Sequence, residues 1–269
     1  MKMIYAKVLA MIFTIVAFIG SNVSSAFAEV NWETNVIEVT GVGAYAPQAR
    51  NAFQARALAK RAAIADAYRQ LLEAVQGVNV TAETTVRDMI TESDVIKTHV
   101  EGCVRGAQIV SEREISGGGY EVTMKMPLFG GNNSIARGVM PEPPQIREHF
   151  PEPRNTISVR GGYTGLIVDC RGLGLKPVMS PVIKNDRGQS IYGYKNLDYD
   201  MVIAKGMASY SYNLNSGVDR AGSNPLIVKA VAVENHNGYP VVSVEDSNKI
   251  LSENNSTHFL EATNVVFIR

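Results

Sequence analysis

The residues whose types and order could do chemistry follow a short apolar run late in the chain. This run, TGLIVD at 164–169, ends in Asp169, and Cys170, Arg171 and a glycine-containing loop come directly after it. Open α/β sheets place functional carboxylates at the carboxyl ends of strands, so Asp169 is a candidate polar group of a binding site. Arg171 could bind an anion or pair with Asp169. We favour a structural turn held by an Asp169–Arg171 pair, because no second carboxylate or histidine stands at a telling spacing.

Cys103 and Cys170 are the two cysteines of the chain. In an oxidising compartment they could form a disulfide, and two free buried thiols are the alternative, since cysteine also packs as a small hydrophobe. Geometry decides between these arrangements, and the sequence leaves the choice open. Cys170 would need a histidine and an orienting partner nearby in space to act as a nucleophile.

The histidines are scattered and form no metal-binding pattern with each other or with the cysteines. The sequence also lacks a G-x-S-x-G elbow and a phosphate-binding loop. We therefore assign no catalytic residue, no metal ligand and no cofactor. The histidines are His99, His149, His236 and His258.

A glycine pair near the start of the chain resembles part of a dinucleotide-binding fingerprint. Gly41-x-Gly43-x-x-Ala46 lies between an expected strand and an expected helix, where glycines can let the backbone approach a pyrophosphate. Pro47 at the helix start and the lack of an acidic residue at the end of a second parallel strand argue against that ligand. We predict a glycine-eased turn from strand to helix instead.

The charges of the chain balance, with 26 Lys and Arg residues against 26 Asp and Glu residues. Such a chain has no global field for nucleic acid or anionic lipid. Basic residues gather at 50–69, but Asp66 and Glu73 interrupt them, so we interpret them as a solvated helix face. We expect no nucleic-acid partner.

Residues 1–28 have the three parts of a secretory signal peptide. Lys2 and Lys7 precede an apolar run, and Ala26-Phe27-Ala28 supplies an A-x-A cleavage site. The apolar run is shorter than the ~20 residues that span a bilayer, so we expect cleavage near Ala28 and no transmembrane anchor. No cysteine lies near the cleavage point, which predicts a periplasmic or exported protein that is not a lipoprotein.

A proline cluster at 138–156 divides the rest of the chain. Proline fixes its own φ and keeps the preceding residue out of the helical region, which favours an extended linker. We predict an α+β domain over 29–138, a Pro-rich linker over 139–155 and a C-terminal α+β domain over 156–269, and we expect the two domains to fold independently. The prolines of the cluster are Pro141, Pro143, Pro144, Pro151 and Pro153.

The first domain is predicted to be a long helix packed on a small, mainly antiparallel sheet. We expect the long helix over 48–76 and a shorter helix over 93–101, and the many alanines of the long helix would let it approach the sheet closely. The expected strands cover 35–43, 78–86, 105–115 and 120–128. The predicted buried stripe of the long helix is Phe53, Ala57, Ile64, Tyr68, Leu71 and Val75.

The second domain is predicted to be a mixed sheet with short helices. The segment Asn185–Gly188 has the composition of a turn, and Asn237-Gly238 separates two expected strands. The expected strands cover 164–169, 226–233, 240–244 and 264–268, and the expected helices cover 198–206 and 245–252.

Three segments of the first domain together resemble a known family. QARNAFQARALAKRAAIADAYRQLLEAVQGVNV (48–80), SDVIKTHVEGCVRGAQIVSE (93–112) and YEVTMKMPLFG (120–130) resemble the Lpp-twenty lipoprotein family, which is similar to the N-terminal domain of flagellar assembly protein T. The resemblance covers about 36–130 and implies an envelope protein with a small α+β domain and no catalytic residues. Lipoproteins of the family carry a lipidated cysteine after the signal peptide, and this chain has none there.

The second domain resembles a domain of unknown function that often follows the first in exported bacterial proteins. The segments that carry this likeness are YTGLIVDCRGLGLKPVMSPVI (163–183) and NPLIVKAV (224–231). Our leading hypothesis is an exported, non-catalytic cell-envelope protein that binds envelope or flagellar proteins, with a role in surface or flagellar assembly. The alternative is a hydrolase or small-ligand-binding protein that uses the loop after Asp169.

Overall fold

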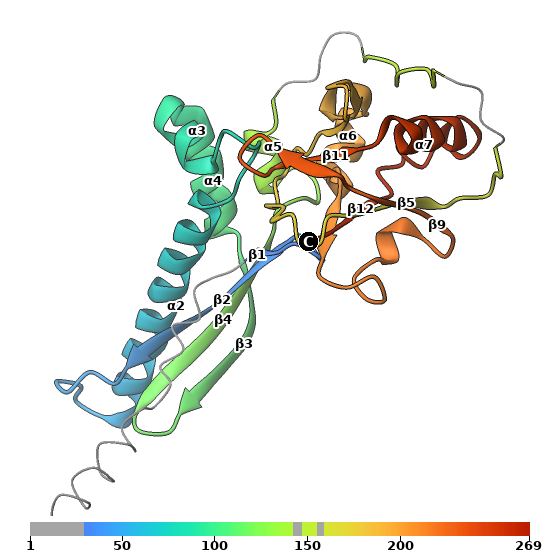
Figure 1. Cartoon of the computed structure of the whole chain (residues 1–269). Helices are drawn as coiled ribbons and strands as arrows, with labels where there is room; N and C mark the ends of the chain where they lie inside the picture. The colour runs from blue at the N-terminus through green and yellow to red at the C-terminus, as the bar shows by residue number, and fades with distance from the viewer. Residues whose placement is uncertain (1–29, 142–146, 155–158) are drawn as a thin grey trace, which may run out of the picture.

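The computed structural model describes residues 30–141, 147–154 and 159–269 (Figure 1). The predicted signal peptide lies outside the described residues, as do two stretches of the predicted linker. The fold class is α+β, as predicted, with a helix on an antiparallel sheet in the N-terminal part and further sheets in the C-terminal part.

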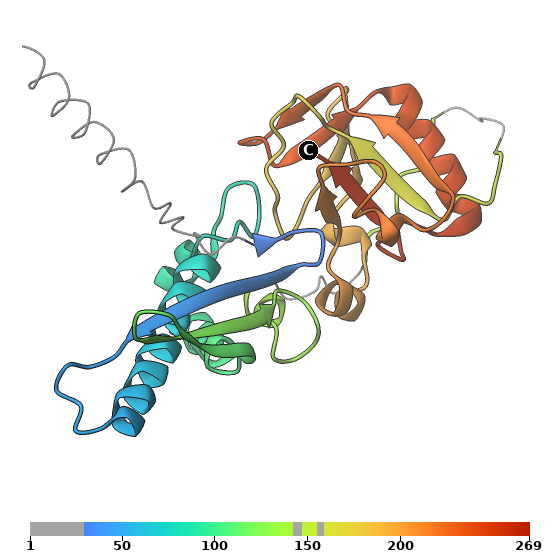
Figure 2. The same ribbon diagram turned by 90° about the horizontal axis from the view of Figure 1, so that it is seen from below.

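The N-terminal part contains one antiparallel sheet covered on one face by a long helix. The helix is α2 (Ala52–Gln76), and it contacts the two central strands of the sheet (Figures 1 and 2). The strands, in the spatial order β1-β2-β4-β3, are β1 (Val30–Asn31), β2 (Val36–Ala44), β4 (Gly119–Pro127) and β3 (Gln108–Ile115). The predicted first strand is confirmed as β2, and the predicted hairpin is confirmed as β3 and β4. Gly117 and Gly118, both with positive φ, form the turn of the hairpin.

Helix and sheet meet at a seam of glycine and alanine. A Cβ placed on Gly41 would lie 2.1 Å from the Ala63 carbonyl oxygen, and one placed on Gly43 would lie 2.1 Å from that of Ala59. These glycines therefore lie inside β2 and let the helix backbone approach it, and they do not form the strand-to-helix turn that we predicted. Close approach through the alanines is confirmed.

The predicted buried stripe of the long helix is wrong at its N-terminal end. Phe53 is 79% exposed and Ile64 is only half-buried, whereas Leu71 and Val75 are fully buried as predicted. The face that meets the sheet instead carries the fully buried Ala59, Ala63 and Ala67. The apolar periodicity of the helix favoured its large side chains as the buried ones. The helix backbone lies so close to Gly41 and Gly43 of β2 that only alanine fits between them. The helix also begins later than predicted, after the N-cap Asn51.

Residues 78–85 form a loop, and Val86 begins a helix, in place of the strand predicted over 78–86. Val78 and Val80 are buried, but the ladder is limited to one isolated bridge between Asn79 and Thr85. Thr85 then makes a capping box with Asp88, which starts the unpredicted helix α3 (Val86–Glu92). Strong capping thus overrides the β-propensity of the segment. Ser93 caps α4 (Asp94–Arg105) as predicted, and a short helix, α5 (Ile135–Val139), follows the hairpin.

The C-terminal part is built around a parallel sheet. Its spatial order is β8-β12-β5-β9, with β8 (Ser209–Ser211), β12 (Val265–Ile268), β5 (Gly165–Asp169) and β9 (Pro225–Lys229). The central strands are buried on both faces. One face joins the main core through Leu166 and Phe267, and the other packs Ile167 and Val266 against Ala221.

A second, mixed sheet completes the C-terminal part. Its order is β10-β11-β6-β7, with β10 (Ala232–Glu234), β11 (Tyr239–Val242), β6 (Ile183–Asn185) and β7 (Ser190–Tyr192). The helices are α6 (Tyr199–Lys205) and α7 (Val244–Thr257), with short 3-10 turns at Tyr194–Asn196 and Asp219–Ala221. The predicted helices are confirmed, and the strand predicted over 226–233 divides into β9 and β10.

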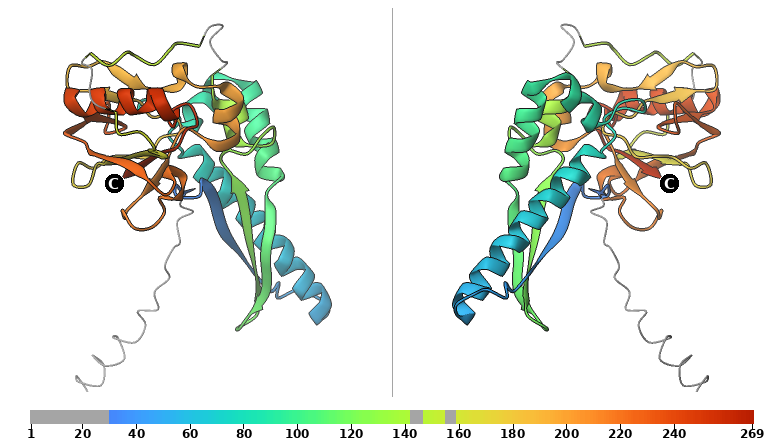
Figure 3. Two further views of the ribbon diagram at one scale, coloured as in Figure 1. Left: turned by 90° about the vertical axis from the view of Figure 1, so that its right-hand side faces the viewer. Right: turned by 90° about the vertical axis from the view of Figure 1, so that its left-hand side faces the viewer.

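The two parts lie against each other (Figure 3). They share an apolar core and several backbone hydrogen bonds. The N–H of Met179 donates to Asn79 O at 2.9 Å, and the N–H of Tyr210 donates to Trp32 O at 3.1 Å. The rings of Trp32 and Tyr210 pack edge to face, with centroids 5.6 Å apart. The predicted domain boundaries stay a prediction, while the shared core argues against independent folding.

The described residues of the Pro-rich segment are fastened to the C-terminal part. The ring of Phe150 stacks on Tyr192, and the N–H of Arg154 donates to Asn248 Oδ1 at 2.9 Å. Just after the segment, the buried carboxylate of Glu253 on α7 accepts the N–H groups of Arg160 and Gly161 at 2.8 and 2.9 Å. The described residues at 150–154 and 160–161 therefore pack against the C-terminal part.

Candidate functional sites

Asp169 and Arg171, the sequence-predicted site residues, form a closed pair at the end of β5. Arg171 donates from Nε to Asp169 Oδ1 at 2.9 Å and from a terminal nitrogen to Oδ2 at 2.6 Å. The backbone N–H of Arg171 also donates to Oδ1, at 3.1 Å. The arrangement is the turn-stabilising pair that we favoured from the sequence.

The pair keeps the Asp169 carboxylate ionised. Hydrogen bonds from the Arg171 side chain hold the pKa of Asp169 below its usual range, and partial burial opposes this only in part. Lys229, in register with Asp169 on the neighbouring strand, acts in the same direction. An ionised carboxylate with both oxygens occupied is poorly suited to general acid chemistry.

The cysteines are both free and buried, so this structure does not contain the disulfide considered from the sequence. Cys170 is fully buried, and burial raises the pKa of its thiol to about 12. Burial also raises the pKa of Cys103. Because the thiolate is the nucleophilic form, neither thiol is activated.

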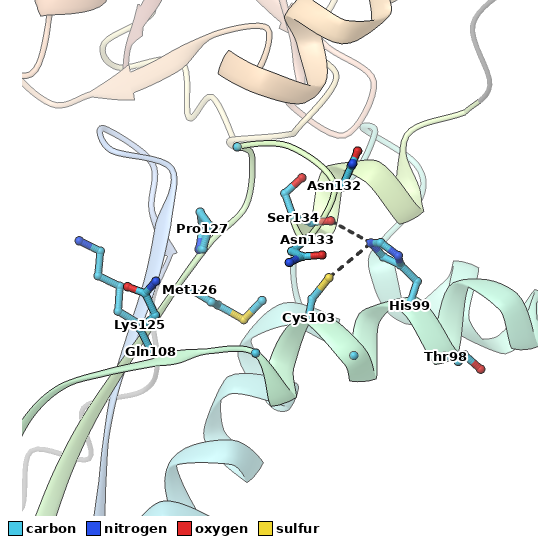
Figure 4. A pocket seen from close by; sticks show the side chains of 13 residues that line it. Thr98, His99, Cys103, Gln108, Lys125, Met126, Pro127, Asn132, Asn133 and Ser134 are labelled. Atoms are coloured by element: carbon cyan, nitrogen blue, oxygen red, sulfur yellow. Dashed lines mark hydrogen bonds between the residues drawn. The ribbon is translucent and has the colours of Figure 1, made fainter.

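Cys103 has a histidine neighbour that sequence reasoning missed. Its Sγ lies 3.3 Å from Nε2 of His99, one turn earlier on α4, and the same Nε2 lies 2.9 Å from the carbonyl oxygen of Ser134 (Figure 4). A carbonyl oxygen only accepts, so Nε2 carries the proton and donates to it. That nitrogen therefore cannot take a proton from Cys103. The spacing of four residues on a helix was the signal that could have revealed the contact.

A cavity of about 630 Å³ opens beside this cluster. Its walls come from α4, from the facing ends of β3 and β4, and from the loop before α5, all within the N-terminal part (Figure 4). Cys103 and Met126 are buried in its floor, and Lys125 and Asn133 lie on its exposed rim. The full lining is Thr98, His99, Gly102, Cys103, Gly106, Gln108, Lys125, Met126, Pro127, Gly130, Asn132, Asn133 and Ser134.

A second cavity, of about 610 Å³, lies on the other side of His99. It is formed between α4, α5 and α6, where Arg137 packs over the ring of Tyr199 and lies 3.9 Å from Asp200. Within the described ranges, no group of three or more His, Cys, Asp or Glu side chains is arranged to hold a metal ion.

The edge strand β3 of the N-terminal sheet is protected against pairing with another strand. Its register shifts between Ile109 and Ser111, and charged residues follow. Glu112 pairs with Lys60 at 2.6 Å, and Arg113 pairs with Glu121 at 2.8 Å. Bulges and charges are the usual means by which proteins guard sheet edges.

The edge strand β9 of the C-terminal sheet is less protected: Pro225 and the exposed Lys229 stand at its two ends, and no register shift interrupts it. Its register with β5 is continuous, and within the residues that the structure describes no strand pairs with its outer side. Ile227, and Val231 just beyond the strand, are each 54% exposed. β9 therefore combines an open edge with apolar side chains.

Comparison with known protein families gives two matches that together follow this architecture. Residues 41–126 match the LPP20 lipoprotein family, and residues 165–269 match the second domain of Treponema pallidum Tp0624. The resemblance of the N-terminal part to the Lpp-twenty family is thus confirmed, and the C-terminal part is similar to a domain that follows in another protein. No curated protein matches the chain in sequence.

The LPP20 match indicates an exported cell-envelope protein. The family is named for a lipoprotein, whereas we predict no lipid anchor; the cleavage region lies outside the described residues, and both the cleavage site and the missing anchor stay predictions. Across residues 30–141, 147–154 and 159–269, no helix is long and apolar enough to cross a bilayer.

Proposed function

From an LPP20-type domain joined to a Tp0624-type second domain, we propose that this protein is a non-catalytic component of the cell envelope that binds other envelope proteins. The observation that carries the proposal is the open edge of β9, with Ile227 and Val231 exposed beside it. An exposed strand edge can accept an extended segment of a partner as an additional strand. A role in surface or flagellar assembly is one setting for such a protein.

The chemistry of the candidate residues supports a binding role over the hydrolase alternative. Asp169 is engaged by Arg171 through both oxygens, and both cysteines are protonated thiols. A small-ligand site in the loop after Asp169 would require this pair to open. Neither of the two cavities described above includes Asp169 or Arg171 in its lining.

The test is a crosslinked pull-down from intact cells that compares the wild type with Ile227→Glu. The substitution removes an apolar contact with the partner, and the new carboxylate disfavours pairing of a partner strand with β9. Envelope proteins that co-purify with the wild type should therefore not co-purify with the variant. Since Ile227 is 54% exposed, the melting temperature should stay within about 2 °C of wild type.

The matched control is Ile109→Glu, which places the same charge on the guarded edge strand β3, where Ile109 is 46% exposed. This variant should retain the partners. Equal recovery of partners with both variants would reject β9 as the binding edge. A purified protein that binds no partner and hydrolyses an envelope substrate in an Asp169-dependent way would reject the binding function.

A further inference from the structure

We propose that the 630 Å³ cavity between α4 and the loop 130–134 binds a small anion that carries amide carbonyl groups, such as an N-acylated sugar acid or a short acidic peptide. This site lies in the N-terminal part, away from β9. The inference goes beyond the proposed partner binding and does not depend on it.

The rim of the cavity offers polar side chains that the fold does not use. Thr98, Gln108, Lys125, Asn132 and Asn133 are all exposed, and among the described residues none of their side chains hydrogen-bonds to another protein group. Lys125 and Gln108 lie on one side of the hollow and the two asparagines on the other (Figure 4). In that view the end of the Lys125 side chain extends away from the asparagines, so this exposed side chain must turn to contact a molecule placed between them.

The charge of the lining determines which ligands fit. No Asp or Glu is among the lining residues, and Lys125 is the one lysine or arginine among them. The amides of Gln108, Asn132 and Asn133 each provide two N–H donors as well as an acceptor. One ammonium group together with amide donors favours a ligand that has a carboxylate and carbonyl oxygens.

The floor of the cavity suits the apolar part of such a ligand. Met126 and the Cys103 thiol are buried at its base, and Pro127 lies beside them. Small-ligand sites commonly combine an apolar floor with a few polar groups that fix orientation. The acyl methyl or an alanine side chain of the ligand would contact this floor.

Gly102 has open space around it at the wall of the cavity. It lies within α4 and lines the cavity, and a Cβ placed on it would meet no heavy atom within 4 Å. Glycine in a helix interior weakens the helix, so its presence here costs stability without relieving any clash. A side chain at this position would extend into space that the ligand would occupy.

The experiment measures binding to the purified wild-type protein by isothermal titration calorimetry with three probes. N-acetylmuramic acid and the peptide acetyl-Ala-Glu carry the proposed chemistry, and N-acetylglucosamine has the acetamido group without the carboxylate. We expect at least one of the two acids to bind with a Kd of roughly millimolar or tighter, and the neutral sugar to bind more weakly. The acid that binds distinguishes a glycan source from a peptide source.

Two variants test the location of the site. Gly102→Leu should abolish binding while raising the melting temperature, because leucine favours the helix and the cavity has room for it. Lys125→Gln should weaken binding of the acid about fivefold, the effect of one exposed charge pair, and leave the neutral sugar unaffected. Lys97→Leu, at an exposed position of α4 outside both cavities, is the matched control and should bind as the wild type does.

Three results would overturn the proposal. These are no binding of either acid at millimolar concentration, stronger binding of the neutral sugar than of both acids, and undiminished binding by a folded Gly102→Leu variant. Gly102→Leu should also keep the partners captured through β9, so that failure of this inference is distinct from failure of the proposed function.

Discussion

At the scale of single residues, Gly41 sets the distance between α2 and the sheet. Replacing it with valine would drive a side chain into the helix backbone, because even a Cβ would lie 2.1 Å from the Ala63 carbonyl oxygen. We expect Gly41→Val to lower the free energy of unfolding by about 3 kcal/mol or more, measured by urea denaturation. Thr40→Val, at the neighbouring exposed position of β2, should change it by less than about 1 kcal/mol. An unchanged free energy of unfolding for Gly41→Val would mean that α2 can move away from β2 at little cost.

The Asp169–Arg171 pair gives a prediction about pH. Hydrogen bonds from Arg171 lower the pKa of Asp169 in the folded protein, so the pair contributes stability above the unfolded pKa of about 3.9. This contribution is lost as the pH falls through the folded pKa. Because the Arg171 side chain is 52% exposed, it should be no more than about 1 kcal/mol.

The measurement compares urea unfolding of the wild type and Asp169→Asn at neutral pH and near pH 3. The wild type should be the more stable at neutral pH, and the difference should shrink on acidification. A difference that grows towards low pH would contradict the assigned ion pair.

At the scale of elements, α2 buries alanines and exposes large side chains at its N-terminal end. Ala63→Leu should therefore destabilise the protein by about 2 kcal/mol through overpacking, whereas Phe53→Ser should be nearly neutral because Phe53 is 79% exposed. Thermal unfolding of the two variants checks this. A larger destabilisation by Phe53→Ser than by Ala63→Leu would instead support the buried face predicted from periodicity.

The elements that the sequence predicts well are those whose own residues determine them. The hairpin 108–127, the cap at Ser93 and the strand ending at Asp169 follow from alternation, side-chain capping and a short apolar run. The stripe of α2 failed because the partner surface, with Gly41 and Gly43, selects the buried face, and no pattern within the helix reports this.

The candidate site was predicted only in part. The turn formed by Asp169 and Arg171 was accessible because its residues are two apart in the chain. The cavity was not, because α4, the strand ends at 108 and 127 and the loop before α5 come together only in the folded protein. The pairing of β12 with β5 is also invisible locally, since about a hundred residues separate them.

At the scale of the whole molecule, the shared core predicts one cooperative unfolding transition. The single tryptophan, Trp32, packs on Tyr210 across the contact between the two parts, so its fluorescence reports on their separation. Far-UV circular dichroism reports on the helices of both parts. The two signals should change at the same urea concentration.

The destabilising variant for this experiment is Tyr210→Ala, which keeps Trp32 as the fluorescence probe. Tyr210 is buried and hydrogen-bonds to both the N–H and the carbonyl of Val178, so its loss should lower the midpoint followed by circular dichroism as a whole. Two separate transitions, in either protein, would instead support independently folding domains with boundaries near 138 and 156.

The contacts of residues 79–80 with 179–180 also bear on the order in which the chain can fold. A ribosome adds ~5–20 residues each second, so several seconds pass between synthesis of the N-terminal part and arrival of the segment that covers it. During that time Trp32, Val80 and Phe129 lack the neighbours on which they finally pack. A chain that is exported in unfolded form must not fold before it has crossed the membrane. Because the N-terminal part completes its core only when the C-terminal part has been made, its folding is delayed. That delay helps such a chain to stay unfolded until it is transported.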